Sequence, residues 1–279
     1  AIARAGAGTN NVPVVKMSER GVPVFNAPGA NANAVKELVI AGMLMAARNL
    51  IPAWNFTNNL TGEDAAMSKA VEAGNKNYAG IELPNRTLGV IGLGAIGSLV
   101  ADAGIKLGMN VLGYDPEITV EAAWRLPSTV RKASSVEEVV KNSDFISLHV
   151  PLLDATRNLI DSARIALMKP GTVLLNFSRE GIVDDKAVVE GLANGQLRGY
   201  MCDFPSNTLK GNPKVVALPH LGASTEEAED NCAIMVADQV RDYLENGNVL
   251  NSVNFPNVSM QREAPFRIAV ANANVPNML

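Results

Sequence analysis

The stretch RTLGVIGLGAIGSLVADAGIKLGMNVLGYDP, residues 86–116, decides the fold. Residues 88–92 form a short apolar run with β-branched members, which predicts a strand. Apolar residues at helical spacing over 95–107 predict a helix, and residues 109–114 predict a second strand. The stretch is therefore one strand–helix–strand unit, the building block of a parallel sheet.

Three glycines between the first strand and the helix have the spacing G-x-G-x-x-G of a dinucleotide site: Gly92, Gly94 and Gly97. The first permits a tight turn, the second lets the backbone approach a pyrophosphate, and the third allows close packing of helix on strand. Ala95 and Ile96 open the helix, whose N-terminal N–H groups favour an anion. The same spacing also occurs in glycine-rich turns that bind nothing, so the neighbouring residues must decide.

Asp115 strengthens the dinucleotide interpretation. It ends the second strand, 18 residues after Gly97, where a carboxylate can accept hydrogen bonds from ribose hydroxyls. It would repel a 2′-phosphate, and Pro116 and Glu117 offer no arginine to hold one. The sequence therefore predicts NAD rather than NADP as the cofactor.

Composition excludes several other classes of function. The 279 residues are 47% apolar and 19% charged, as in a soluble globular chain with enough core for two domains. A net charge of −4 gives no footprint for nucleic acid or an anionic membrane, and the longest apolar run, 38–47, is too short to cross a bilayer. With two cysteines and two histidines, the sequence indicates neither a disulfide framework nor a metal site. We expect a cytoplasmic protein.

Both ends of the chain look cut. An apolar run, residues 1–5, begins the chain without Met, and a strand-like run over 266–270 has no evident partner strand. We therefore expect a fragment of a longer protein.

Elsewhere, strand and helix patterns alternate, which predicts a doubly wound parallel sheet of the Rossmann type. Asn33 is expected to cap a helix over 33–50 that Pro52 ends, and residues 55–85 are expected to form a helix and a loop. Ser224 or Thr225 should open the last helix, and Gly247 should end it. Further strands are predicted at 1–5, 21–26, 143–150, 171–177 and 200–204, and further helices at 12–20, 135–141, 151–167 (with a loop), 184–193 and 225–244.

Arg179 follows a predicted strand, at the edge of the sheet where α/β enzymes bind ligands. A guanidinium there can hold a substrate carboxylate bidentately. On spacing alone, a surface arginine paired with Glu180 or Asp184 is an equally good interpretation.

His220 and His149 are the two candidates for proton transfer near neutral pH. His220 lies in a loop before the last long helix, whereas His149 lies at the end of an apolar strand, so His220 is favoured. Either histidine could instead be structural.

Three other residues have open interpretations. Asp203, at a strand end, is a cap or faces the nicotinamide. Arg4, beside a glycine turn, is a solvated charge or binds an acidic substrate. Cys202 is most simply a small buried residue.

Taken together, the motifs resemble those of the D-isomer-specific 2-hydroxyacid dehydrogenases and, within that family, of the D-3-phosphoglycerate dehydrogenases. The matching stretches span nearly the whole chain: RAGAGTNNV from Arg4, FNAPGANANAVKELVIAGM from Phe25, the glycine unit, SLHVPLLDATRNLI from Ser147, LLNFSREGIVDDKAV from Leu174 and LPHLGASTEEAEDNCA from Leu218.

The resemblance implies a nucleotide domain, residues 35–223, inserted in a smaller substrate domain, residues 1–34 and 224–256. Residues 257–279 would begin an effector-type domain that is cut short. Arg179 would orient the substrate and His220 would act as acid and base. Cofactor contacts would fall on Gly92, Gly94, Ala95, Ile96, Gly97, Asp115, Val150, Phe177, Ser178, Arg179, Asp203, His220, Gly222 and Ala223, and substrate contacts on Arg4, Gly6, Ala7, Gly8 and Arg179.

One departure concerns the chemistry. The family's catalytic glutamate should follow Asp203 by five residues, and that position is Thr208. A carboxylate beside His220 would raise the pKa of the imidazole. Without it, we expect His220 to titrate lower or to be oriented by a neutral group such as Asn207 or Thr208.

The implied reaction is NAD-dependent oxidation of D-3-phosphoglycerate to 3-phosphohydroxypyruvate, a step of serine biosynthesis. One alternative is a reductase for glyoxylate, hydroxypyruvate or another small 2-keto acid. Another, of a different class, is an NAD-sensing binding protein without turnover, like the corepressors that share the fold. The family also implies a homodimer.

Overall fold

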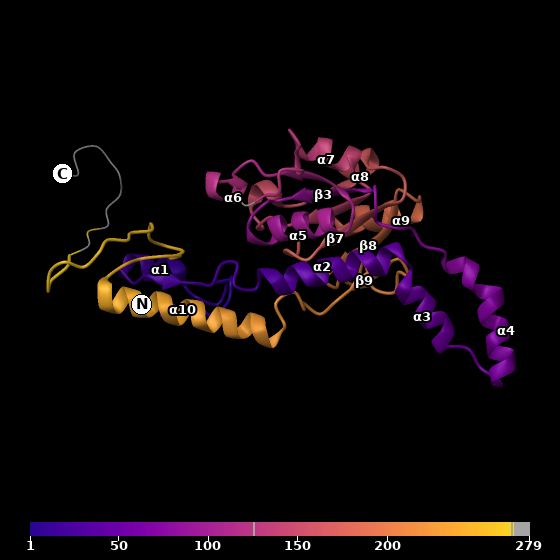
Figure 1. Cartoon of the computed structure of the whole chain (residues 1–279), viewed down its shortest axis with the longest axis horizontal. Helices are drawn as coiled ribbons and strands as arrows, with labels where there is room; N and C mark the ends of the chain where they lie inside the picture. The colour runs from indigo at the N-terminus through magenta and orange to yellow at the C-terminus, as the bar shows by residue number, and fades with distance from the viewer. Residues whose placement is uncertain (125, 269, 271–279) are drawn as a thin grey trace. The chain divides into compact units, whose positions relative to one another are not determined.

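The computed structural model describes residues 1–124, 126–268 and 270, and the chain divides into two compact units (Figure 1). Asn33–Gly222 forms one unit. The other combines Ala1–Ala32 with the segment from Ala223 onward. The functional labels predicted for these parts of the chain stay predictions, and the expectations for residues 269 and 271–279 lie outside the described residues.

A parallel sheet of seven strands forms the centre of Asn33–Gly222, in the order β5-β4-β3-β6-β7-β8-β9. The chain builds outward from β3 to β5 and then returns to β6 on the other side of β3. This order is that of a doubly wound nucleotide-binding sheet, so the predicted fold class is confirmed. The strands are β3 (Thr87–Ile91), β4 (Asn110–Tyr114), β5 (Arg131–Lys132), β6 (Phe145–Leu148), β7 (Thr172–Asn176), β8 (Leu197–Cys202) and β9 (Val215–Ala217).

Helices cover both faces of this sheet. In Figure 1, α7 (Val136–Asn142) and α8 (Ser162–Leu167) lie on one side of the strands, and α2 (Ala32–Ala47) and α5 (Ala95–Lys106) lie on the other. Alternate side chains of each strand therefore enter different hydrophobic cores, which is why these strands read as continuous apolar runs. The shorter elements of the unit are α6 (Val120–Trp124), η2 (Asp154–Thr156) and α9 (Asp185–Ala193).

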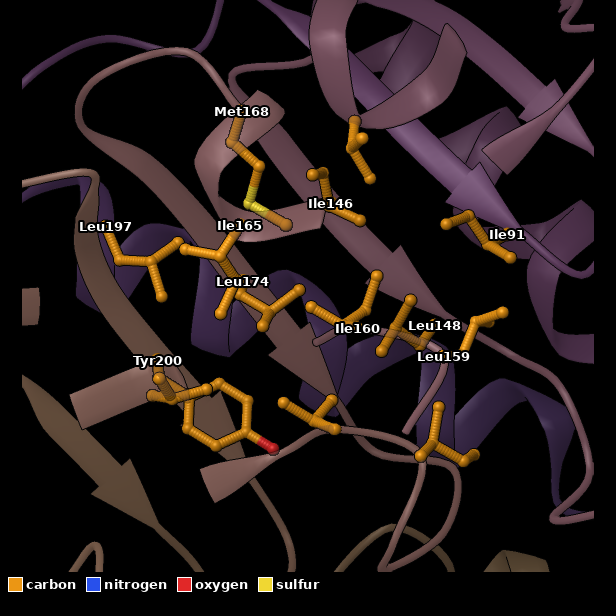
Figure 2. Close-up of a cluster of buried hydrophobic side chains, with 14 of the residues drawn as sticks. Ile91, Ile146, Leu148, Leu159, Ile160, Ile165, Met168, Leu174, Leu197 and Tyr200 are labelled. Carbon is orange, nitrogen blue, oxygen red and sulfur yellow. The ribbon is translucent and has the colours of Figure 1, made fainter. Parts of the chain in front are cut away.

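Strand β7 illustrates the alternation. Its Leu174 joins the core beneath α7, α8 and α9, where it lies near Ile146 and Ile165 (Figure 2). Its Val173 and Leu175 join the core beneath α2 and α5. All three side chains are fully buried, so both faces of the sheet are closed to water.

The predicted end of the first long helix is wrong. α2 stops at Ala47, and Asn49 follows with φ +51°, a left-handed conformation that breaks the helix. Pro52 lies in the first turn of the next helix, α3 (Leu50–Asn58), where its missing N–H is tolerated. The predicted cap is also wrong, because Asn33 lies inside α2 and its side chain donates to Glu37 Oε1.

Residues 50–85, which follow α2, form an arm. It contains α3, α4 (Asp64–Gly74) and the short helix η1 (Asn75–Tyr78), and over residues 55–85 it agrees with the predicted helix and loop. Figure 1 shows α3 and α4 extending away from the sheet of their unit. Neither helix has a buried residue.

The second unit is built from two distant segments. β1 (Ile2–Ala3) pairs in parallel with β2 (Val24–Phe25), and α1 (Val14–Glu19) connects them. α10 (Glu226–Asn246) begins after Thr225, whose side chain accepts from Ala228 N, and ends at Gly247 with φ +72°. Both predicted ends of this helix are confirmed.

The strand predicted over 266–270 is wrong for the residues that the structure describes there. Phe266, Ile268 and Val270 are 80 to 88% exposed and pair with no strand of the described chain. A strand needs a hydrogen-bonded neighbour, which an apolar sequence pattern cannot supply by itself.

Among the helices of the described residues, none has the length and apolar character to cross a membrane.

Candidate functional site

The carboxyl ends of the central strands meet at one edge of the sheet. Their register pairs Ile91 with Leu148, Leu148 with Asn176, and Asn176 with Cys202. The segments that follow these strands therefore start side by side. The order of the sheet reverses between β3 and β6, and ligands of open α/β sheets bind outside the carboxyl ends at such a reversal.

The glycine turn after β3 is shaped by two of its three glycines. Gly92 has φ +92°, and a Cβ there would lie 2.4 Å from the carbonyl oxygen of His149. A Cβ at Gly97 would lie 1.9 Å from the carbonyl oxygen of Gly92. A Cβ at Gly94 would meet nothing within 4 Å. The protein's own packing explains the first and third glycines, and the open space at Gly94 suits close approach of a phosphate.

Asp115 is attached to this turn. Its Oδ2 accepts from Leu93 N at 2.8 Å and its Oδ1 accepts from Glu117 N at 2.9 Å. A carboxylate offers about four lone pairs, so each oxygen retains capacity for a ribose hydroxyl. The bond from Leu93 N thus connects the turn directly to the carboxylate.

Arg179 follows β7 in a turn that a buried asparagine organises. Asn176 donates to Arg179 O at 2.9 Å and accepts from Ser178 N, while Ser178 Oγ donates to Leu148 O at the end of β6. The Arg179 side chain is exposed and, within the described residues, forms no ion pair with Glu180 or Asp184. The role of Asn176 in this turn was not predicted, although a polar residue at the end of a buried apolar strand could have indicated it.

His220 lies in an exposed loop after β9 and has φ +58°, which is uncommon for a residue other than glycine. Its imidazole packs on the ring of Phe204, with centroids 5.3 Å apart and planes at 61°. Two residues on, Gly222 N donates to Asp203 Oδ2 at 2.7 Å. The ends of β8 and β9 thereby hold the histidine loop.

Asp203 has one oxygen without a partner. The residue is 1% exposed, and its Oδ1 has no hydrogen bond within the described residues. A buried carboxylate oxygen without a donor is costly, so the site favours a ligand that can donate to it. An amide N–H of a nicotinamide has this chemistry, and the role of Asp203 beside the nicotinamide stays a prediction.

His149 is in a different environment. Its Nε2 lies 2.8 Å from Ser147 Oγ, and desolvation lowers the pKa of the imidazole from 6.5 to about 3. The imidazole is therefore neutral near pH 7, which makes it a poor proton donor.

Cys202 is fully buried, and desolvation raises the pKa of its thiol to about 11. The prediction of a small buried residue is confirmed.

The loop that contains Thr208 is exposed at that residue. It is attached through Ser206, whose hydroxyl donates to Asp185 Oδ2 at 2.6 Å. Burial, the largest cause, raises the pKa of Asp185, whereas the hydrogen bond from Ser206 lowers it. This hydrogen bond attaches the loop to the start of α9.

Five of the predicted site residues belong to the other unit: Arg4, Gly6, Ala7, Gly8 and Ala223. There, Gly6 O accepts from Ala27 N at 3.0 Å and Ala7 O accepts from the Asn26 side chain at 2.7 Å. A Cβ at Gly6 would lie 1.8 Å from Arg4 Nη1, so the arginine folds over this loop, and the φ of +145° at Gly6 is a conformation that favours glycine. All other predicted site residues lie within Asn33–Gly222, and their roles stay predictions.

Residues 40–222 match the family model described as "D-isomer specific 2-hydroxyacid dehydrogenase, NAD binding domain". The chain belongs to the D-isomer specific 2-hydroxyacid dehydrogenase family. It contains that family's NAD-binding domain, so the predictions of the family and of NAD as cofactor are confirmed. The open glycine turn, Asp115 and the unpaired oxygen of Asp203 fit this cofactor.

Relatives give a finer comparison. The chain is 40% identical to D-3-phosphoglycerate dehydrogenase of Methanocaldococcus jannaschii over 94% of its own length and 48% of the relative's. It is 36% identical to the enzyme of the same name from Haemophilus influenzae, over 98% of its own length and 65% of the relative's. The chain thus spans about half to two thirds of these relatives.

Among solved structures, the chain is similar to 3-phosphoglycerate dehydrogenase of Entamoeba histolytica with bound NAD⁺. The TM-score is 0.70 at 28% identity, covering 91% of this chain and 74% of the other.

Proposed function

We propose that this chain is part of an NAD-dependent dehydrogenase that oxidises D-3-phosphoglycerate to 3-phosphohydroxypyruvate. The observation that carries the proposal is the placement of His220, Asp203 and Arg179 after strands that end at the same edge as the glycine turn. The 40 and 36% identical relatives bear the name of this enzyme. The step belongs to serine biosynthesis.

NAD, when bound, provides the acceptor for hydride from C2 of the hydroxy acid. The glycine turn and Asp115 would hold the cofactor, and Asp203 Oδ1 would accept from its amide. Four further residues end or follow the strands of the same edge and would line the cofactor: Val150, Phe177, Ser178 and Gly222. Ala223 is the remaining predicted cofactor contact.

His220 would remove the proton of the 2-hydroxyl group in oxidation and return it in the reverse reduction. Arg179 would bind the substrate carboxylate through paired N–H donors, and Arg4 with the backbone of Gly6, Ala7 and Gly8 would bind the remaining anionic groups. Proton transfer therefore rests on one exposed imidazole, and substrate orientation rests on guanidinium groups.

The test uses the full-length protein and follows the change in NADH absorbance with 3-phosphoglycerate, phosphohydroxypyruvate, glyoxylate, hydroxypyruvate and 2-oxoglutarate. We expect turnover with the phosphorylated acids, and a His220→Asn variant should lose about 10²- to 10⁴-fold in kcat while it still binds NADH. Preference for glyoxylate or hydroxypyruvate would replace the substrate and keep the reaction class. NADH binding without turnover on any acid would refute the enzyme and favour a corepressor-like NAD sensor.

We also infer that the protein is a homodimer that works in the cytoplasm. α3 and α4 have no buried residue, and Trp54 on α3 is 61% exposed, so this arm presents an apolar surface that a second copy can cover. Both cysteines are buried as free thiols, in agreement with a reducing compartment.

A Trp54→Glu variant tests the dimer. A charge on the arm should shift sedimentation velocity from dimer toward monomer, because a carboxylate in a covered apolar surface is costly. Trp124→Glu is the matched control, since Trp124 is 83% exposed on α6 of the same unit. A monomeric parent protein, or a dimer that Trp54→Glu leaves intact, would contradict the inference.

A further inference from the structure

The imidazole of His220 packs against the aromatic ring of Phe204. Its ring meets Phe204 edge to face at 5.3 Å, within the range that aromatic pairs prefer. Within the described residues of Asn33–Gly222, the imidazole takes part in no hydrogen bond or ion pair. In the described part of this unit, the edge-to-face contact with Phe204 is therefore the directional interaction that the imidazole makes.

The backbone of the histidine loop is held separately. Leu218 N donates to Cys202 O at 2.8 Å before the histidine, and Gly222 N donates to Asp203 Oδ2 at 2.7 Å after it. These two bonds hold a left-handed residue, a conformation that persists only where its surroundings impose it. These bonds hold the backbone on either side of His220, but they do not restrict the torsion angles of its side chain.

Phe204 follows the end of β8, directly after Asp203. Asp203 accepts a hydrogen bond from the backbone of the histidine loop, and Phe204 contacts the imidazole. The Phe204 side chain is half-buried, and its backbone oxygen accepts from Cys202 Sγ. The half-buried Phe204 therefore borders the exposed imidazole, and a backbone bonded to Cys202 carries its ring.

We propose that Phe204 is a positioning residue, whose ring holds the His220 imidazole in the orientation that proton transfer requires. Its catalytic consequence rests on the proposed function. The phenyl ring has no group that exchanges a proton, so it acts only through His220. Proton transfer depends steeply on the position of the donor and acceptor atoms, which gives orientation a measurable effect.

The contact is tested first by NMR of the whole chain with bound NADH. The chain has two histidines, so the imidazole Cε1–H signals are few and assignable with a His149→Gln variant. Phe204→Leu should move the His220 signal, because the ring current of Phe204 is removed. Phe56→Leu is the matched control, because Phe56 pairs with Tyr78 at the same 5.3 Å in the arm. An unmoved His220 signal in Phe204→Leu would overturn the proposal.

Kinetics then test the role. Phe204→Leu should lower kcat by about threefold to tenfold and leave the KM for the hydroxy acid unchanged, as expected for loss of one aromatic contact. Phe204→Tyr keeps the ring and should restore kcat. A Tyr variant as slow as the Leu variant, or a Leu variant with full kcat, would overturn the positioning role.

The two proposals fail in different ways. If the parent protein turns over none of the acids, the proposed function is lost, and the NMR comparison still decides whether Phe204 holds the imidazole. If the parent protein is active and the His220 signal ignores Phe204, only the positioning role is lost.

Discussion

His149 and His220 show how position alone separates two identical side chains. His149 directly follows β6, with Ser147 Oγ at 2.8 Å from its Nε2 and with the pKa of its imidazole lowered to about 3. His220 is exposed in a left-handed loop. The sequence favours the same residue for a weaker reason, since it can show only that one histidine follows an apolar strand and the other lies in a loop.

The low pKa of His149 predicts a pH dependence of stability. Above pH 6.5 the imidazole is neutral in both the folded and the unfolded chain and contributes nothing. Below pH 6.5 the unfolded chain takes up a proton that the folded chain refuses, so the free energy of unfolding falls as pH falls toward 3. The slope from this residue is at most about 1.4 kcal/mol per pH unit.

A His149→Gln variant should therefore lose less stability than the parent between about pH 7 and pH 5, measured by urea unfolding. Glutamine places a polar group where Nε2 lies, so the bond to Ser147 can persist. Parallel pH profiles for the two proteins would show that His149 is hydrated in the folded state.

At the scale of elements, the glycine turn between β3 and α5 separates packing from ligand binding. Gly97→Ala puts a methyl group 1.9 Å from Gly92 O, so we expect a loss of about 1–3 kcal/mol in the free energy of unfolding. Gly94→Ala enters open space and should leave the melting temperature unchanged, while NADH binding weakens at least tenfold, ~1.4 kcal/mol. Thermal unfolding and NADH fluorescence titration of both variants check this. Equal effects of the two substitutions on stability would contradict it.

The elements differ in how far the sequence predicts them. The unit from β3 to β4 could be predicted in full, because its apolar periods and glycine spacing are local signals. The break after α2 could not, because Pro52 is compatible with either the end or the first turn of a helix. The break is made by Asn49, whose side chain donates to Tyr78 O and Ala79 O about thirty residues later. The Phe204–His220 contact depends in the same way on how β8 and β9 end side by side.

At the scale of the whole molecule, the two units differ in how they are encoded. Asn33–Gly222 is continuous, and both of its hydrophobic cores come from that one segment. The other unit joins Ala1–Ala32 to the segment from Ala223 onward, through pairs such as Phe25 with Ser252. Pairing across more than two hundred residues leaves no local signal, which is why the resemblance to a family, rather than periodicity, indicated the inserted arrangement.

This asymmetry predicts that residues 32–222, which include all of α2, fold alone. The segment retains both cores, the glycine turn, Asp115, Asp203 and His220, so we expect cooperative thermal unfolding and NADH binding. It lacks Arg4 and the loop from Gly6 to Gly8, so kcat/KM with 3-phosphoglycerate should fall at least about 100-fold relative to the whole chain.

Fluorescence titration with NADH and the absorbance assay measure both quantities in one preparation, and Gly94→Ala in the same segment serves as the binding control. A folded segment that does not bind NADH would place part of the nucleotide site in the other unit. A segment as active as the whole chain would remove Arg4 and its loop from the substrate site and leave Arg179 as the guanidinium that binds the acid.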